Sequence, residues 1–193
     1  MTEISRETRE TKIKCSLEIN GTGKSTISTG VGFFDHMLEA LAKHSGMDLE
    51  LSCDGDLHVD AHHTVEDCGI VIGKALKNEI FPIEAVERYG NATVVMDEAA
   101  TTCALDLSNR PFLVYEVNVS GKVGEFDVEL AEEFFHAVSG NAGLTVHIIQ
   151  DRGRNKHHIL EASFKAFAVA LRRALVRNER LGIPSTKGVL WLN

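Results

Sequence analysis

The apolar residues of the first half of the chain alternate at first and then recur with helical spacing. "IKCSLEIN" alternates from Ile13 to Ile19, "GTGK" supplies a turn, and "STISTGVG" continues as a second strand, so the pattern predicts a β-hairpin. "FFDHMLEALAKHSG" has the period of a helix that stops at Gly46. "MDLELSC" predicts a further strand, and a helix with one apolar face is expected over residues 62–80.

The second half of the chain repeats this order. Two or three β-rich runs in "ATVVMDEAATTCALDLSNRPFLVYEVNV" precede a helix in "DVELAEEFFHAVSGNAG", a strand in "LTVHIIQ" and a long amphipathic helix in "HHILEASFKAFAVALRRALV". His62 and His157 are 95 residues apart, whereas His36 and His136 are 100 apart, a difference that loop lengths can absorb. The chain is therefore predicted to contain an internal duplication.

The predicted fold is α+β, in which each half forms a sheet of about four strands with two helices on one face. The first structural repeat is expected over residues 1–87 and the second over residues 88–193. A chain of 193 residues can bury a substantial core. We therefore expect the two repeats to pack intimately as a single catalytic unit.

Composition and charge narrow the classes of partner. Hydrophobic residues make up 44% and charged residues 25% of the chain, as in an ordinary soluble globular protein. The formal net charge of -8 argues against a nucleic-acid-binding surface, which normally carries a basic patch. It leaves room for local cationic pockets that bind an anionic small molecule.

The cysteines and the N-terminus indicate a cytoplasmic protein. Cys15, Cys53, Cys68 and Cys103 form no CxxC pair and lie mostly in apolar runs, which favours buried, reduced thiols. The N-terminal "MTEISRETRETK" has no apolar signal region, and no apolar run is long enough for a membrane helix. We expect a soluble intracellular protein with no membrane partner.

Two clusters, "DAHHTVEDCGI" and "RNKHHILEASF", each hold two adjacent histidines followed by a glutamate. In the first cluster His62 and Glu66 are i and i+4 on the predicted helix, and His63 and Glu66 are i and i+3. Adjacent helical residues project about 100° apart. Neighbouring histidines therefore suit two metal ions that lie in different directions better than one ion that both would chelate.

The ligand types indicate which metals such sites would take. Imidazole nitrogens combined with carboxylate oxygens suit zinc, iron or manganese. A further histidine is repeated between the halves, His36 in the first and His136 in the second. Together with the two clusters, these residues provide enough ligands for two sites of three histidines and one glutamate each. The candidate metal ligands are His36, His62, His63, Glu66, His136, His157, His158 and Glu161. One HHxxE sequence alone is more often a solvated helix face, but its duplication favours metal binding.

Other signals are weaker. "NGTGKST" has part of a Walker A loop, but Glu18 stands where the first glycine is required and β-rich "TISTG" follows, so a hairpin turn is the better interpretation. Guanidinium, ammonium and hydroxyl groups suit a phosphate monoester. The candidates for such a pocket are Arg88, Arg110, Lys165, Ser185 and Lys187, each of which taken alone has the character of a surface residue. Glu10, in the polar N-terminal arm, carries no functional signal by itself.

Five strings resemble the imidazoleglycerol-phosphate dehydratase family of histidine biosynthesis. They are "GTGKSTISTGVGFFDHMLEALAKHSG", "DLHVDAHHTVEDCGIVIG", "SNRPF", "GRNKHHILEASFKAFAVAL" and "PSTKGVL". The resemblance extends from about Thr8 to Leu190 with no departure at a motif position, and the paired HH motifs are highly specific to the family.

The resemblance implies a fold, an assembly and a cofactor. The fold would be a duplicated α+β unit like the second domain of ribosomal protein S5. The enzyme would be a homo-oligomer of 24 subunits built from trimers, with metal sites between subunits. Two Mn²⁺ ions per active site would be held by the eight candidate ligands.

The resemblance also implies roles for individual residues. Catalytic roles would fall to Glu10, Glu66 and Glu161, with Glu10 as an acid/base residue near the substrate. Substrate and phosphate binding would involve Glu10, His36, His44, His62, Arg88, Arg110, Lys165, Ser185 and Lys187.

The implied reaction is the loss of water from D-erythro-imidazole-glycerol phosphate, which gives imidazole-acetol phosphate. Its difficulty is that the proton to be removed lies on a carbon and is not acidic. Metal ions on the substrate imidazole would hold the ring as imidazolate, which expels the neighbouring hydroxyl. The resulting diazafulvene-like species acidifies the next C–H, and a carboxylate such as Glu10 would shuttle the proton.

Two other functions are compatible with the same ligands. A dinuclear metallohydrolase would bridge its metals with water, although such enzymes typically take aspartate-rich ligands from loops rather than helices. A non-catalytic protein would use the metals as clips between subunits. In that case, metal removal would dissociate the oligomer without any loss of turnover.

Overall fold

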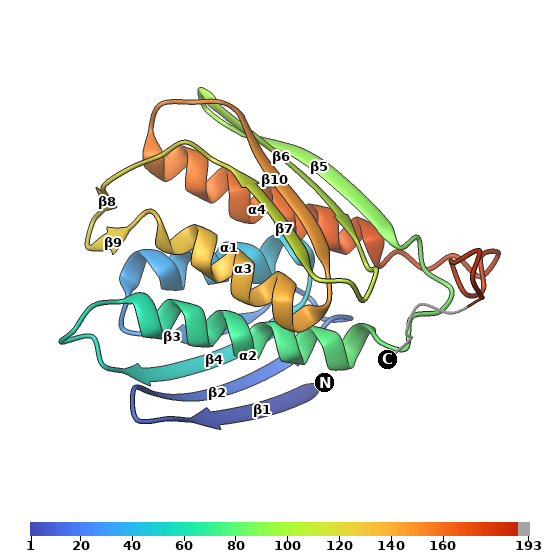
Figure 1. Ribbon diagram of the computed structural model, residues 1–193, viewed down its shortest axis with the longest axis horizontal. Coiled ribbons are helices and arrows are strands. Elements are labelled where there is room, and N and C mark those ends of the chain that lie inside the picture. Colours follow the sequence, from blue (N-terminus) through green and yellow to red (C-terminus); the bar gives the residue numbers. More distant parts are fainter. Residues whose placement is uncertain (189–193) are drawn as a thin grey trace.

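The computed structural model describes residues 1–188, and its first half is a four-stranded sheet with two helices on one face (Figure 1). The strands are β1 (Thr2–Glu7), β2 (Thr11–Glu18), β3 (Ser25–Ser28) and β4 (Asp48–Gly55), in the order β1-β2-β4-β3. The helices are α1 (Gly32–Ser45) and α2 (His62–Ile80). Strand β3 runs parallel to β4, and the other pairs are antiparallel.

The second half has the same topology. Its sheet contains β5 (Tyr89–Met96), β6 (Ala99–Asp106), β7 (Phe112–Glu116) and β10 (Thr145–Arg152), in the order β5-β6-β10-β7. Its helices are α3 (Leu130–Ala142) and α4 (Lys156–Ala174). Strand β7 runs parallel to β10, as β3 does to β4. The predicted duplication of a four-stranded α+β unit is therefore confirmed.

The two unequal offsets between the repeats have a structural cause. A two-stranded ribbon, β8 (Lys122–Val123) and β9 (Phe126–Asp127), is inserted between β7 and α3 and delays the arrival of His136. The β10–α4 loop is shorter than the β4–α2 loop, which reduces the offset again before His157. Both changes fall in connections, so the helices that carry the histidines are preserved.

The helices of both halves lie between the two sheets (Figure 1). Helix α2 packs against α3, and α1 packs against α4, so the halves are related by an approximate twofold. A chain of aromatic rings crosses this layer: Phe134 lies 5.4 Å from Phe34 and 5.2 Å from Phe164 between ring centroids. Because buried aromatic side chains contribute much of a core's apolar area, this contact joins the two repeats.

In β2, buried residues alternate with more exposed ones, as the sequence pattern predicted. Ile13, Cys15 and Leu17 are buried, whereas the residues between them are not. All four cysteines are free, and burial raises the pKa of the Cys15 and Cys103 thiols to about 12. The prediction of buried, unpaired thiols is confirmed for three of the four, since Cys53 is half-buried.

The predicted hairpin between residues 13–19 and the strand after "GTGK" is wrong. Strand β4 lies between β2 and β3, because its buried Leu49 and Leu51 fit the centre of the sheet, while β3 is short and mostly exposed at the edge. Asp48 Oδ1 accepts the N–H groups of Thr22 (2.8 Å) and Lys24 (2.9 Å) and so guides the chain past β4. The polar N-terminal arm forms the edge strand β1.

The helix boundaries agree closely with the sequence pattern. Helix α1 ends at Gly46, which has a left-handed φ of 81° and donates its N–H to the Ala42 carbonyl at 3.0 Å. Helix α2 begins at His62, whose N–H donates to Asp60 Oδ1 at 2.8 Å. Within residues 1–188, no helix combines the length and the apolar character that crossing a membrane requires. The family resemblance at residues 189–190 lies outside the described residues.

Candidate functional site

Three of the predicted metal ligands meet between helices α1 and α4. His36 comes from α1, and His157 and Glu161 lie one turn apart on α4. Glu161 Oε2 is 3.0 Å from His157 Nε2 and 3.5 Å from His36 Nε2, and the three ligand atoms lie within 4.8 Å of one another. Two imidazole nitrogens and a carboxylate oxygen at this separation fit manganese, iron or zinc.

The carboxylate of this group is ionised by its surroundings. Glu161 is only 6% exposed, and Lys165 Nζ lies 2.6 Å from its Oε1. Burial by itself raises the pKa of Glu161, but the hydrogen bond and charge of Lys165, helped by His157, outweigh burial and lower it. The side chain is therefore negative at neutral pH, as a metal ligand must be.

The start of α4 is fixed by Asn155. Its side-chain oxygen accepts the N–H groups of His157 (3.0 Å) and His158 (3.4 Å) as an N-cap. The ring of Phe33 packs edge-on against His157 with centroids 5.1 Å apart. The first histidine of this pair is thus held from both its backbone and its ring.

The equivalent group of the first repeat is more open. His62 Nε2 lies 3.7 Å from Glu66 Oε2 on α2, and both side chains are 44% exposed. His136 is exposed on α3, the helix that packs against α2. In the described part of the chain, only His36, His157 and Glu161 form a three-ligand group within 4.8 Å. His62, Glu66 and His136 are therefore not brought together in the same way.

The second histidine of the first pair faces acidic residues. His63 Nδ1 is 2.9 Å from Asp56 Oδ2, and its Nε2 is 3.8 Å from Glu10 Oε1. The hydrogen bond to Asp56 raises the pKa of His63, with smaller contributions from the charges of Asp56 and Glu10. Glu10 lies in the turn between β1 and β2, which brings this N-terminal residue beside the histidine pair.

The second histidine of the other pair has the same kind of surroundings. His158 Nδ1 is 2.8 Å from Glu98 Oε2, and its Nε2 is 3.8 Å from Asp97 Oδ2. Glu98 Oε1 also accepts the N–H groups of Arg154 (3.2 Å) and Asn155 (2.8 Å). The bond from His158, followed by these backbone bonds, lowers the pKa of Glu98 to about 2.

Two of the predicted phosphate-binding residues surround Asp106. Arg88 donates from Nε to Asp106 Oδ1 at 2.7 Å and from Nη2 to Oδ2 at 3.0 Å, which raises the pKa of the guanidinium. Arg110 is 66% exposed, and its Nη2 lies 3.6 Å from Asp106 Oδ2. Asp106 therefore fixes Arg88 firmly and leaves Arg110 open to solvent.

The C-terminal segment brings a second pair of candidates toward Arg88. Arg88 Nη1 donates to the Pro184 carbonyl at 2.8 Å, which places the following Ser185 near this cation. Ser185 Oγ accepts the N–H of Lys187 at 3.2 Å, and the Lys187 side chain is exposed. Lys165, in contrast, is paired with the metal-ligand candidate Glu161.

His44 occupies the last turn of α1 and is half-buried. Burial, followed by the charges of Lys165 and Arg172, lowers the pKa of His44. The imidazole is therefore neutral at pH 7 and can donate or accept a hydrogen bond.

Three carboxylates at the site were not predicted from the sequence. Asp56 and Glu98 hold the histidine pairs, and Asp106 holds Arg88. None of them belongs to an HHxxE cluster. The available signal is a chemical rule, because a metal-binding histidine usually donates its second ring N–H to a carboxylate or carbonyl. Sequence alone does not say which carboxylate reaches the ring.

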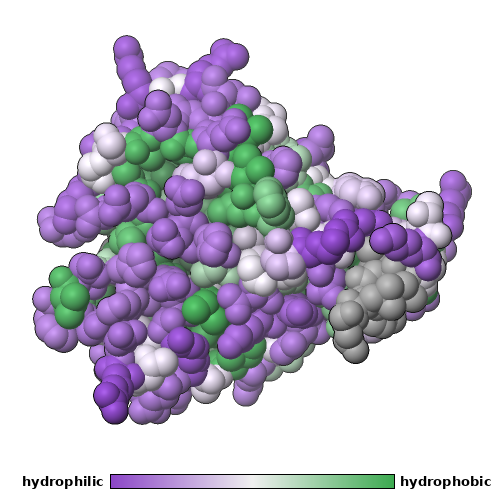
Figure 2. Space-filling model, viewed as in Figure 1, coloured by the Kyte–Doolittle hydropathy of each residue, from purple (hydrophilic) through white to green (hydrophobic). Residues whose placement is uncertain are grey.

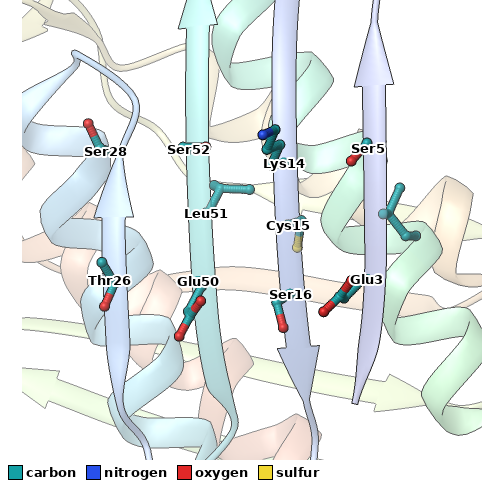
Figure 3. Close-up of a pocket in the computed structure, with 11 residues that line it drawn as sticks. Glu3, Ser5, Lys14, Cys15, Ser16, Thr26, Ser28, Glu50, Leu51 and Ser52 are labelled. Carbon is teal, nitrogen blue, oxygen red and sulfur yellow. The ribbon is translucent and has the colours of Figure 1, made fainter.

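A hollow of about 390 Å³ lies elsewhere, on the face of the first sheet that points away from the helices (Figure 3). Among its lining residues are Glu3, Ser5, Lys14, Ser16, Thr26, Ser28, Glu50 and Ser52. None of the residues that line it is a predicted site residue. The histidine pairs are therefore the better candidates for the chemistry.

Comparison with known proteins identifies relatives that match nearly the whole chain. The family model described as imidazoleglycerol-phosphate dehydratase matches residues 29–171. The imidazoleglycerol-phosphate dehydratase of Aliarcobacter butzleri is 84% identical over 190 residues, which cover 98% of this chain and 100% of that protein. The enzyme of Wolinella succinogenes is 62% identical over the same shares.

Solved structures agree with these relatives. The crystal structure of imidazoleglycerol-phosphate dehydratase from Staphylococcus aureus matches with a TM-score of 0.81 and 42% identity, over 92% of this chain and 100% of that one. The structure from Pyrococcus furiosus matches with a TM-score of 0.84 and 38% identity, over 97% and 100%. At these identities the likeness extends beyond the fold alone.

Proposed function

The chain belongs to the imidazoleglycerol-phosphate dehydratase family, and we propose that its duplicated histidine pairs carry out the reaction of that family with bound metal. As a member it is a hydro-lyase of histidine biosynthesis. The proposed reaction converts D-erythro-imidazole-glycerol phosphate into imidazole-acetol phosphate and water. The observation that carries the proposal is the convergence of His36, His157 and Glu161.

We propose Mn²⁺ as the cofactor, with two ions per active site. The ligands would be His36, His62, His63, Glu66, His136, His157, His158 and Glu161. When bound, the ions would act as Lewis acids that favour the anionic form of the substrate's imidazole ring. The donor set supports this assignment, because nitrogen and carboxylate ligands without thiolates suit manganese and iron. The imidazolate and diazafulvene pathway stays a prediction.

The remaining residues would bind the substrate and move its proton. Arg88, Arg110 and Lys187 would hold the phosphate together with Ser185 and Lys165, since fixed cations and a hydroxyl suit phosphate oxygens. Asp106 supports Arg88 in this role through its double hydrogen bond.

Proton transfer is assigned to a carboxylate beside the histidine pair. Glu10 would shuttle the proton: it would give one proton to the departing hydroxyl, which leaves as water, and would take up the carbon-bound proton, so that the carboxyl ends in its starting form. Glu10 suits this role because it is exposed and lies 3.8 Å from His63. Glu66 and Glu161 are proposed to act catalytically as ligands, and His36, His44 and His62 to contact the substrate.

We further propose that the working enzyme is a homo-oligomer, a 24-mer built from trimers. In one chain His63 and His158 face carboxylates rather than the three-ligand group, which supports sites completed by other subunits. Tyr89, Val95 and Phe112 of the second sheet are 62–71% exposed, although the face in Figure 2 is mainly hydrophilic. Exposed apolar residues of this kind are available for burial between subunits. The free thiols support a cytoplasmic location.

Turnover measurements test the proposal. Protein reconstituted with Mn²⁺ is expected to convert imidazole-glycerol phosphate to the ketone product, and His63→Ala or Glu161→Ala to abolish conversion. His147→Ala, at an exposed position on β10, is the matched control. Full activity in metal-free protein would overturn the metal mechanism. Metal-dependent assembly without turnover would instead favour the structural clip, and phosphate release from the substrate would favour a hydrolase.

A further inference from the structure

We propose that Asp56 and Glu98 are positioning residues that hold the second histidine of each pair, His63 and His158, in the form that binds metal. This inference rests on the proposed metal-binding function. Each carboxylate contacts Nδ1 of its histidine, at 2.9 Å for Asp56 and 2.8 Å for Glu98. An N–H at Nδ1 that donates to a carboxylate leaves the lone pair of Nε2 free to serve as a ligand.

The geometry of the two histidine pairs is nearly the same. The rings of His62 and His63 have centroids 6.1 Å apart and planes at 86°, while those of His157 and His158 are 6.2 Å apart at 82°. Each first histidine lies beside the glutamate one turn further along its helix. Each second histidine turns away from that glutamate toward its own carboxylate. The second ring of each pair therefore points toward a carboxylate that contacts its Nδ1.

The two carboxylates come from different places in the duplicated fold. Asp56 lies in the loop between β4 and α2, whereas Glu98 lies in the turn between β5 and β6. The turn equivalent to that of Glu98 in the first repeat joins β1 to β2 and holds Glu10, which faces Nε2 rather than Nδ1. The same ring contact is therefore made by non-equivalent residues. Simple inheritance from the duplication does not explain it, but a shared requirement at Nδ1 does.

Backbone contacts hold the loop that carries Asp56 and the carboxylate of Glu98 in place. The N–H of Asp56 donates to the Glu10 carbonyl at 3.0 Å. The preceding Gly55 approaches α2 so closely that a Cβ there would lie 2.1 Å from Thr64 Oγ1. Glu98 is fixed by the N–H groups of Arg154 and Asn155, the residues that lead into α4. Each carboxylate thus ties the start of a histidine-bearing helix to a neighbouring turn.

Amide substitutions separate positioning from a structural role. In Glu98→Gln the side-chain carbonyl can still accept the backbone N–H groups, but its NH₂ faces His158 Nδ1 and favours the tautomer that is protonated on Nε2. In Asp56→Asn the NH₂ likewise faces His63 Nδ1, whereas Oδ1 of Asp56 is buried without a hydrogen-bond partner and so has no backbone bond to preserve. We expect each substitution to weaken Mn²⁺ binding about 10- to 100-fold, as measured by calorimetric titration of the purified oligomer. Glu50→Gln, on the outer face of the first sheet, is the control and is expected to bind Mn²⁺ like the unmodified protein.

A spectroscopic measurement examines the tautomer without any metal. Solid-state NMR of metal-free protein labelled with ¹⁵N-histidine is expected to give a signal for His158 protonated on Nδ1, assigned by its absence in His158→Asn. In Glu98→Gln this signal is expected to move to the Nε2-protonated form. Thermal melting of the same samples reports whether the fold is intact, and Glu98→Ala shows the effect of losing the backbone bonds as well.

The outcomes distinguish this inference from the proposed function. A changed tautomer together with weaker Mn²⁺ binding supports the positioning role. An unchanged tautomer, or unchanged Mn²⁺ affinity in both amide variants, overturns it even if the unmodified enzyme turns over its substrate. If the tautomer and affinity change as expected but the unmodified protein has no dehydratase activity, the positioning role is supported and the proposed function is overturned.

Discussion

Lys165 Nζ lies 2.6 Å from Glu161 Oε1, while the other carboxylate oxygen of Glu161 faces His157 and His36. The two oxygens therefore have separate partners: a cation on one side and the candidate metal ligands on the other. This arrangement explains how a buried carboxylate stays charged next to two imidazoles. It also means that the phosphate-binding role predicted for Lys165 competes with a role in supporting the metal site.

Lys165→Met is expected to destabilise the protein, because it leaves the buried Glu161 carboxylate without its cation. The expected loss is about 1–3 kcal/mol in the free energy of unfolding, measured on metal-free protein by chemical denaturation. Adding Glu161→Gln is expected to restore part of this stability, since no charge then needs compensation, without restoring activity. A double variant no more stable than Lys165→Met would contradict the pairing.

Arg88→Lys is expected to impair substrate binding and also to lower the stability of the fold around Asp106. A lysine cannot reproduce the two parallel hydrogen bonds to Asp106 or the third to the Pro184 carbonyl. We expect kcat/KM to fall roughly 10- to 100-fold, in line with the loss of one charge-assisted bond, mainly through a higher KM. Steady-state kinetics measure this change, and Arg152→Lys on the exposed end of β10 is the control. An unchanged KM would argue against phosphate binding at Arg88.

Much of the fold could be predicted because its signals are local. Helix α2 begins and ends where the apolar spacing predicted, since periodicity and capping both act within a few residues. The strand order could not be predicted in the same way. The central place of β4 depends on pairing with β2 and β3 at once, and on the side chain of Asp48.

The same difference between local and long-range signals applies to the candidate site. The HHxxE clusters could be recognised in the sequence because the two histidines and the glutamate of each cluster lie within about one helical turn. Glu98 and His158 are 60 residues apart in the sequence, so no local spacing predicts their contact. The tight group of His36 with His157 likewise depends on how α1 packs on α4.

Low pH is expected to destabilise the loop that precedes β3, because it protonates the Asp48 carboxylate that accepts hydrogen bonds from this loop. The N–H groups of Lys24 and Thr22 lower the pKa of this carboxyl below its usual value. A carboxyl whose pKa is lower in the folded state contributes stability above its unfolded pKa of about 3.9, and this contribution is lost as the pH falls through the folded value. Asp48→Asn is therefore expected to melt at a lower temperature than the unmodified protein at pH 7. The difference should shrink as the pH falls below the unfolded pKa and the carboxyl becomes protonated in the folded state as well. A constant difference across this range would contradict the assignment.

The glycines of "GIVIG" set the distance between helices α2 and α3. A Cβ on Gly69 would lie 2.8 Å from Ala137 Cβ, and one on Gly73 would lie 2.8 Å from the Val138 carbonyl oxygen. Gly69→Ala and Gly73→Ala must therefore push the helices apart, with an expected cost of about 1–3 kcal/mol each.

The matched control for these substitutions is Gly140→Ala on α3. A Cβ at Gly140 meets no other atom within 4 Å, so this change is expected to stabilise the helix by about 0.5–1 kcal/mol. Because α2 carries His62 and Glu66 while α3 carries His136, Gly69→Ala is also expected to lower metal affinity, which calorimetry can measure alongside unfolding. If all three substitutions had the same effect on stability, close packing of α2 on α3 would not be what these glycines provide.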